Sequence, residues 1–279
     1  MRLLSSATIT TQPPVAQRMR WLLIGIVVAY VAILILAPVG ALIVGAFSHG
    51  VGALLATLRD PDAQAAFSLT LQISLITVAV HTIFGTVVAW VLVRHRFRGR
   101  RWLNALIDLP FAISPVVVGY IILLLFGAQG LFAPLTDALN IQVAFAVPGM
   151  VLATLFVTLP LMIREVAPLL QSLDQEPEHA AATLGASAWR TFWRVTFPAL
   201  RWGIFYGVAL TFARALGEFG AVLVVGGDIQ GSTETAPLYI FRALDNRNDS
   251  AAFSVALVLG LLSLTLVFGI ERLRKRARV

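Results

Sequence analysis

The chain has no cysteine, which excludes disulfide bridges and thiolate metal sites. Its single lysine, Lys275, is followed by an arginine, so the phosphate-binding motif G-x-x-x-x-G-K-[ST] is absent. The G-x-S-x-G turn of hydrolases and the H-E-x-x-H zinc motif do not occur either. The sequence therefore predicts no ATP site, no catalytic residue, no metal site and no cofactor in this chain.

Charged residues are scarce, at 13% of the chain, and hydrophobic residues make up 58%. Six long apolar runs stand out, and each has about the 20 residues that a helix needs to cross a bilayer. The residue-by-residue alternation of a membrane β-barrel is absent, so the spans are predicted to be helices. The chain is thus predicted to be an all-α, polytopic membrane protein with six spans: 21–47, 63–93, 109–126, 145–163, 202–227 and 250–270.

Basic residues are distributed unevenly between the two sides of these spans. Only Arg59, Arg242 and Arg247 fall on one side, and seventeen fall on the other. Those seventeen are Arg2, Arg18, Arg20, Arg94, Arg96, Arg98, Arg100, Arg101, Arg164, Arg190, Arg194, Arg201, Arg272, Arg274, Lys275, Arg276 and Arg278. Because cytoplasmic loops carry the excess of basic residues, both termini and the loop 164–201 are predicted to be cytoplasmic.

This topology also sets the predicted domain organisation. Residues 1–20 form a cytoplasmic leader, and residues 21–279 form one membrane domain. The arginine cluster over 94–101 is typical of a topology anchor at lipid headgroups. The net charge of +7 follows from the topology and gives no reason to expect nucleic acid as a partner.

Two charges interrupt the fifth apolar run. Arg214 and Glu218 are four residues apart and would share one helix face. They would lie about 20 and 26 Å from a helix start near Arg201, at 1.5 Å per residue. Such buried charges face the bundle interior or a water-filled path. The pair either stabilises the bundle or lines a path, and both roles are compatible. Gly217 and Gly220 predict a weak point here, as a gate requires.

Residues 173–198 form the segment best suited to docking another protein. Asp174 can cap a helix that contains the alanines 180–182, and Gly185 can end it in a left-handed conformation. Ser187 can cap a second short helix, and Pro198 marks the approach to the next apolar run. Small side chains allow close approach of another surface. The segment therefore predicts a contact site for a soluble partner.

The same segment resembles a known family signature. The inner-membrane permease subunits of ATP-binding-cassette (ABC) importers carry E-A-A-x3-G-x9-I-x-L-P in this loop. Ala180, Ala181, Gly185 and Pro198 match in register, with apolar Val195 and Phe197 at the Ile and Leu positions. The chain departs from the signature at His179, which stands where the family usually has Glu. Glu178 lies one position earlier, about 100° around the helix.

Within that family, four segments resemble the sulfate/thiosulfate permeases, and most closely their W subunit. They are residues 106–119, 148–160, 213–222 and 227–240. Molybdate or tungstate permeases share R-x-L-G-E-F-G and are the alternative. The resemblance implies a bacterial inner membrane location and the architecture of type I ABC importers. It also implies four partners: a second, T-type permease subunit, two copies of an ATP-binding subunit, and a periplasmic sulfate/thiosulfate-binding protein.

The resemblance assigns two sets of site residues. ATPase coupling is expected of Glu178, His179, Ala180, Ala181, Gly185, Trp189 and Pro198. The translocation pathway or gate is expected to involve Ser114, Thr154, Thr158, Arg214 and Glu218. His81, in an apolar helix, is expected to be a hydrogen-bonded packing residue rather than a proton relay.

Three other classes of function fit parts of the sequence. A proton-coupled secondary transporter could use Glu218 as its carrier, but six spans without a repeat would then require a dimer. A channel is compatible with the topology, and conductance without ATP would reveal it. An intramembrane enzyme lacks a nucleophile with an adjacent base. Neither transporter nor channel explains the docking segment.

Overall fold

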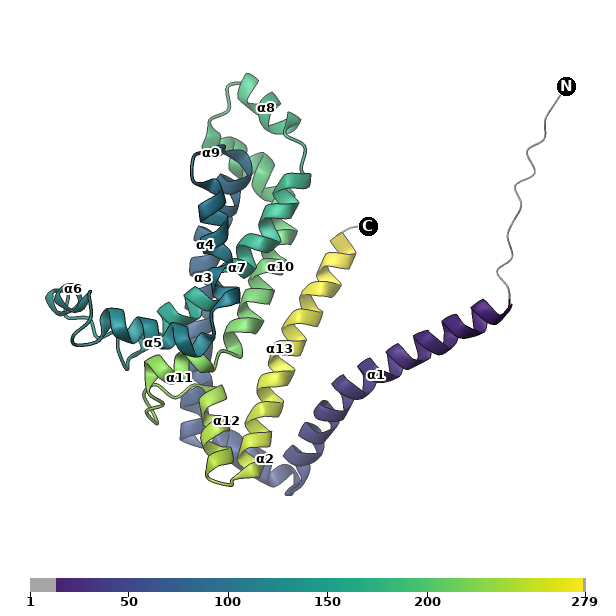
Figure 1. The fold of residues 1–279 in the computed structure, drawn as a ribbon, viewed down its shortest axis with the longest axis vertical. Helices are drawn as coiled ribbons and strands as arrows, with labels where there is room; N and C mark the ends of the chain where they lie inside the picture. The colour runs from purple at the N-terminus through teal and green to yellow at the C-terminus, as the bar shows by residue number, and fades with distance from the viewer. Residues whose placement is uncertain (1–13, 278–279) are drawn as a thin grey trace.

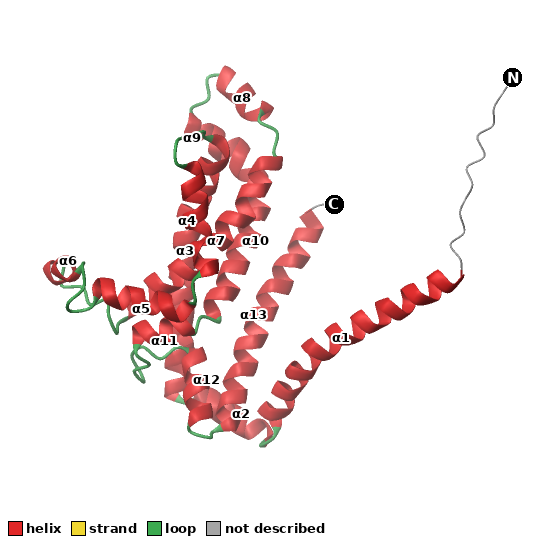
Figure 2. Cartoon of the chain, in the orientation of Figure 1, coloured by secondary structure: helices red, strands yellow, loops and turns green. Residues whose placement is uncertain are grey.

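A computed structural model describes residues 14–277, and within them every regular element is a helix. Figure 1 shows an elongated bundle with two segments that diverge from it, and Figure 2 shows that short loops join the helices. Five helices are long and apolar enough to cross a membrane, and one bent helix pair makes the sixth candidate. The all-α prediction with six spans is confirmed. The predicted leader falls mostly on residues 1–13, outside the described residues.

The bundle is built on α3 (Pro61–Arg94), α7 (Val147–Ser172) and α10 (Phe197–Leu216), each of which packs against the other two. Helix α13 (Asp249–Ala277) packs against α10. The apolar core between α3, α7 and α10 is fully closed, with Met162, Ile163 and Leu200 showing no exposed surface. Such packing lets α3, α7 and α10 move as one body.

The first helix, α1 (Pro14–Phe47), diverges from the bundle and packs against α2 (Gly50–Arg59) and α13. Its candidate span covers Met19–Phe47 and has no buried residue in its most apolar window. A helix that exposes apolar side chains all around is suited to a lipid environment. The prediction of a span at 21–47 is confirmed.

The third span differs from its prediction as one helix over 109–126. It is a bent pair, α4 (Arg100–Ala112) and α5 (Pro115–Phe126), with 112° between the two axes. Ser114 lies at the break with φ −60° and ψ 136°. A residue before proline is pushed out of the helical region by the proline ring, so Pro115 forces the break. Helix α5 therefore turns aside and carries α6 (Ala133–Ala138) away from the bundle (Figure 1).

The fifth span also differs from its prediction as a single helix over 202–227. It begins earlier, because α9 (Ala188–Thr191) and the π-helix η1 (Phe192–Thr196) run without interruption into α10. It also ends earlier, at Leu216, and a separate short helix α11 (Gly220–Gly226) follows. The break covers Gly217 to Phe219, and Gly217 ends α10 with φ −96° and ψ 15°. The predicted helical distance to Glu218 is therefore wrong, since Glu218 lies beyond the end of α10.

Helices α11 and α5 pack closely together, and glycine makes that approach possible. A Cβ on Gly119 would lie 2.6 Å from the backbone oxygen of Ala221. The loop 140–145 is fixed to the same place, since the Phe145 N–H donates to the Val225 oxygen at 2.8 Å. The two breaks, at Ser114 and at Gly217, are thus brought to neighbouring positions in the fold by the α5–α11 contact.

The lower end of the bundle in Figure 1 is closed by α12 (Ala236–Asp245), which the sequence did not predict. The Tyr239 hydroxyl donates to Asp60 at 3.2 Å, and Arg242 pairs with buried Glu234. Burial, reinforced by the charge of Asp60 and the hydrogen bond to it, raises the pKa of Tyr239 to about 12. The Ala236 N–H donates to Thr70 of α3 at 2.8 Å. These bonds hold the loop between α11 and α13 onto α3.

Candidate functional site

The predicted docking segment forms α8 (Glu176–Thr183) at the end of the bundle opposite α12 (Figure 1). The Asp174 carboxylate accepts the N–H of Glu176 at 3.0 Å, and Gly185 has the left-handed φ of +78°. Ser187 accepts the N–H of Arg190 at 3.4 Å and caps α9. The predicted cap at Ser187 and the glycine turn are confirmed, whereas the N-cap of α8 is Gln175, and Asp174 accepts its hydrogen bond from one position earlier. The predicted second helix is not a separate element. It is the first turn of one continuous helical segment, Ala188–Leu216, which continues through Pro198 into α10 and is called the rod below.

The side chains of α8 and of the turn that follows it differ in how far they are exposed to solvent. His179 and Ala180 are exposed, whereas Glu178 and Ala181 are half-buried on the side of the bundle. Beyond the helix, Leu184 is 88% exposed and Trp189 is 71% exposed. Large apolar side chains with that exposure at a polar tip are typical of a contact surface. The sequence reasoning missed Leu184, although an apolar residue directly before the turn glycine was a usable signal.

Glu178 is turned into its own subunit. Its Oε1 atom lies 3.2 Å from Arg94 Nη2 and accepts a hydrogen bond from the Thr196 hydroxyl at 2.8 Å. Arg94 is the last residue of α3, and Thr196 ends the π-helix before α10. The sequence placed Arg94 only in the topology anchor. Its partner is 84 residues away, so no local pattern indicates the pair.

Arg214 and Glu218 form the predicted ion pair. Arg214 Nη1 lies 2.7 Å from Glu218 Oε2, and the Glu218 side chain is only 2% exposed, against 39% for Arg214. The other carboxylate oxygen accepts the Ala221 N–H at 3.3 Å, in the first turn of α11. Glu218 therefore connects the end of α10 to the start of α11 across the break at Gly217. The pairing is as predicted, although the two residues do not share a helix face.

The remaining pathway candidates lie in different surroundings. Ser114 is exposed at the break between α4 and α5, whereas Thr154 and Thr158 are fully buried inside the subunit. Each threonine hydroxyl donates to the carbonyl four residues before it, at 2.9 and 2.7 Å. His81 Nε2 lies 3.0 Å from both Thr158 Oγ1 and the Leu155 carbonyl, as expected of a hydrogen-bonded packing residue. The structure does not bring the three hydroxyls to one surface, and their role in a pathway stays a prediction.

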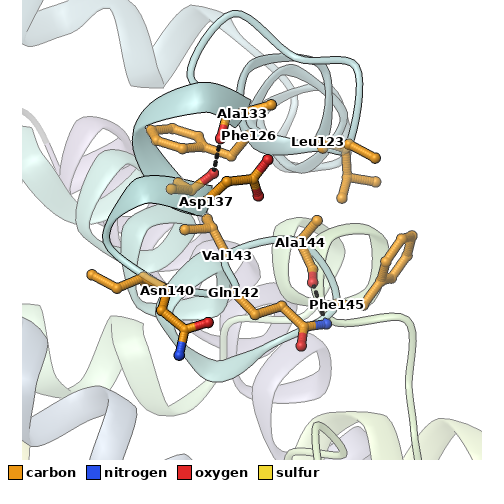
Figure 3. A pocket seen from close by; sticks show the side chains of 13 residues that line it. Leu123, Phe126, Ala133, Asp137, Asn140, Gln142, Val143, Ala144 and Phe145 are labelled. Atoms are coloured by element: carbon orange, nitrogen blue, oxygen red, sulfur yellow. Dashed lines mark hydrogen bonds between the residues drawn. The ribbon is translucent and has the colours of Figure 1, made fainter.

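A cleft of about 810 Å³ lies between the end of α5, α6 and the loop 140–145 (Figure 3). Phe126 provides an apolar wall, and Asp137, Asn140 and Gln142 provide polar groups. The Gln142 amide donates to the Ala144 carbonyl at 3.2 Å within the loop itself. None of the predicted site residues lines this cleft.

Comparison with known proteins identifies the family. The family described as "Binding-protein-dependent transport system inner membrane component" matches residues 81–279. The chain belongs to this family. The matched region of the permease includes α8, both charged residues at the α10–α11 break, and the buried threonines. A permease subunit of this kind is a multi-pass membrane protein, in agreement with the six candidate spans.

The permease is similar to sulfate transport proteins over nearly its whole length. It is 44% identical to the "Sulfate transport system permease protein CysW" of Synechocystis sp., over 96% of this chain and 97% of that one. It is 46% identical to "Sulfate permease 2, chloroplastic" of Chlamydomonas reinhardtii, over 90% of this chain and 68% of that one. It is also 36% identical to the permease protein CysT of Escherichia coli, over 91% of each chain.

Solved structures share its fold at low sequence identity. A bacterial ABC transporter that imports the acidic polysaccharide alginate matches with a TM-score of 0.77 and 16% identity, over 93% of this chain and 96% of that one. The same transporter type in complex with its alginate-loaded periplasmic protein matches with a TM-score of 0.76. The fold is that of the type I ABC importer permeases, as predicted.

Proposed function

We propose that the permease is the W-type subunit of an ATP-driven importer of sulfate and thiosulfate, and that it forms part of the translocation pathway. The observation that carries the proposal is the end-to-end similarity to sulfate permeases. The exposed α8 supports the ABC mechanism, because a chain without an ATP motif needs a surface that receives an external energy source. The molybdate alternative is not favoured, because the reported relatives are sulfate proteins.

The proposed partners follow from this role. A T-type permease subunit completes the membrane domain, two copies of an ATP-binding subunit hydrolyse ATP, and a periplasmic protein delivers the anion. The permease lies in the bacterial inner membrane with α8 and both termini in the cytoplasm. The distribution of basic residues supports this orientation. Residues 1–20 are the cytoplasmic leader and residues 21–279 the membrane domain, with the coupling loop at 164–201.

The mechanism rests on the rod that follows α8. Residues Ala188–Leu216 form one continuous helical segment of 29 residues, or about 43 Å at 1.5 Å per residue. One end begins three residues after Gly185, and the other end meets the Arg214–Glu218 pair. When the ATPase subunits close on ATP, they displace α8 with its exposed residues His179 and Ala180, together with the exposed Trp189 of α9. The rod carries that displacement to the break at Gly217, where α11 and α5 shift relative to α10.

The proposal is tested by uptake into bacterial cells that lack their own sulfate importers. The permease is expressed with its ATPase, second permease subunit and binding protein. We expect uptake of radioactive sulfate that an excess of unlabelled thiosulfate inhibits and an equal excess of molybdate does not. A complex that accumulates molybdate and leaves sulfate outside contradicts the assignment. Omission of the permease alone, with the other three proteins present, is the control and should abolish uptake.

A further inference from the structure

Helix α8 is held to the bundle by very few contacts. None of its residues is buried, and a cavity of about 220 Å³ lies beneath it, lined by Trp90, Ala182 and Phe192 among others. Packing therefore does not fix its orientation. Among residues 14–277, Glu178 makes the only ion pair and the only side-chain hydrogen bonds between α8 and other helices.

Glu178 compensates the buried positive charge of Arg94. Its side chain is 7% exposed, and its Nε atom has no hydrogen-bond partner. Glu178 is the one carboxylate within ion-pair distance among the described residues. A buried charge that loses its counter-charge is strongly unfavourable, so the arginine and the glutamate hold each other in place. The Thr196 hydroxyl, itself buried, fixes the same carboxylate oxygen from the other side.

These three residues join α8 to two helices of the core. Arg94 ends α3, and Thr196 lies in the rod that becomes α10. Both α3 and α10 pack along α7. Residues 173–175 join the start of α8 to α7, and the turn at Gly185 joins its end to the rod, with open space where a Cβ on Gly185 would lie. Among the described residues, Glu178 is the one side chain of α8 that bonds directly to α3, in addition to the indirect routes through α7 and the rod.

We propose that Glu178 is a positioning residue that transmits motion of α8 to α3, through a tether formed by Arg94, Glu178 and Thr196. The inference rests on the proposed function and adds a role for this carboxylate inside the subunit. Glu178 does not bond the ATPase, because its carboxylate is engaged with its own bundle. The docking contact falls instead to the exposed residues of α8, His179 and Ala180. Movement of α8 then shifts α3 and the rod together, rather than rotating α8 about the Gly185 turn.

The first test measures the ratio of anion transported to ATP hydrolysed in the reconstituted complex. Glu178→Gln and Arg94→Gln should each lower this ratio about fivefold or more, the lower end of measured coupling between sites. ATPase subunits should still co-purify, and hydrolysis should continue. Glu176→Gln on the same helix turn and Arg96→Gln beyond α3 are matched controls that should behave as wild type. A normal ratio in both tether variants overturns the proposal, as does loss of the ATPase from Glu178→Gln complexes.

The second test replaces the ion pair by a covalent bond. Because the chain has no cysteine, Arg94→Cys with Glu178→Cys gives a unique thiol pair. The double variant should be uncoupled, and a short flexible thiol crosslinker should restore transport per ATP. A crosslinked complex that stays uncoupled contradicts the tether. Wild-type complexes that hydrolyse ATP without transporting would contradict the proposed function itself, so the two failures are distinguishable.

Discussion

Replacing Arg214 by alanine is expected to remove most of the folded permease from the membrane. The substitution leaves Glu218, whose side chain is 2% exposed, without its counter-charge. Removal of one partner from a buried ion pair costs about 3–5 kcal/mol, a large part of the stability of a typical domain. Glu218→Ala should be less damaging, because the stranded Arg214 is 39% exposed and its long side chain can reach water or a polar group. The yield of monodisperse, detergent-solubilised protein measures both effects.

The double variant separates pairing from independent roles. Arg214→Ala with Glu218→Ala leaves no uncompensated charge, so its loss of stability should be smaller than the two single losses added together. Additive losses in the thermal unfolding of the four proteins would show that the pair contributes nothing as a pair. Arg59→Ala is the control, since Arg59 is exposed at the last position of α2 and should be replaceable without loss.

Replacing Ala180 by tryptophan is expected to release the ATPase subunits while the permease stays folded. Ala180 is exposed on α8, and nothing in the subunit requires its small size. A bulky side chain there prevents the close approach that an alanine-rich helix allows. Co-purification of the ATPase with the tagged permease measures the effect directly. Ala180→Ser, which keeps the side chain small, should retain the ATPase.

Two related variants refine this test. Ala181→Glu is a weaker probe, because Ala181 is half-buried toward the bundle and its replacement also disturbs the tether. His179→Glu should be tolerated, because it restores the residue that the family signature carries at this position. An Ala180→Trp complex that retains its ATPase and transports normally would show that α8 is not the docking helix.

Sequence reasoning located the spans and the two helix starts on either side of Gly185 because both leave local signals. Uninterrupted apolar runs predict spans, and the caps at Asp174 and Ser187 with Gly185 between them predict two helix starts and a turn. The polarity and type of a few consecutive residues determine the spans, the caps and the turn. The basic residues predict the orientation of the chain by the same kind of local signal, and that orientation stays a prediction.

The parts that sequence reasoning missed depend on backbone breaks and on long-range contacts. The hydropathy of the sequence does not reveal the break at Ser114. Pro115 changes the direction of the chain there, but the chain stays apolar on both sides of it. The end of α10 at Leu216 was marked only by nearby glycines. Glu178 contacts Arg94 across 84 residues, and only the packed fold brings them together. The helices and turn of one short segment were therefore predictable, and the contacts of its residues with other helices were not.

The charge of the loops predicted to lie outside indicates how the anion reaches the permease. The loops predicted to lie outside carry seven acidic residues (Asp60, Asp62, Asp137, Asp228, Glu234, Asp245 and Asp249) against three arginines. A surface of that sign repels free dianions, so the anion must arrive on a carrier.

The decisive measurement is sulfate uptake into proteoliposomes that contain the permease, its second permease subunit and the ATPase. Our account predicts uptake only when ATP and the periplasmic binding protein are both supplied. Uptake that persists without the binding protein, or that a proton gradient drives without ATP, would contradict it.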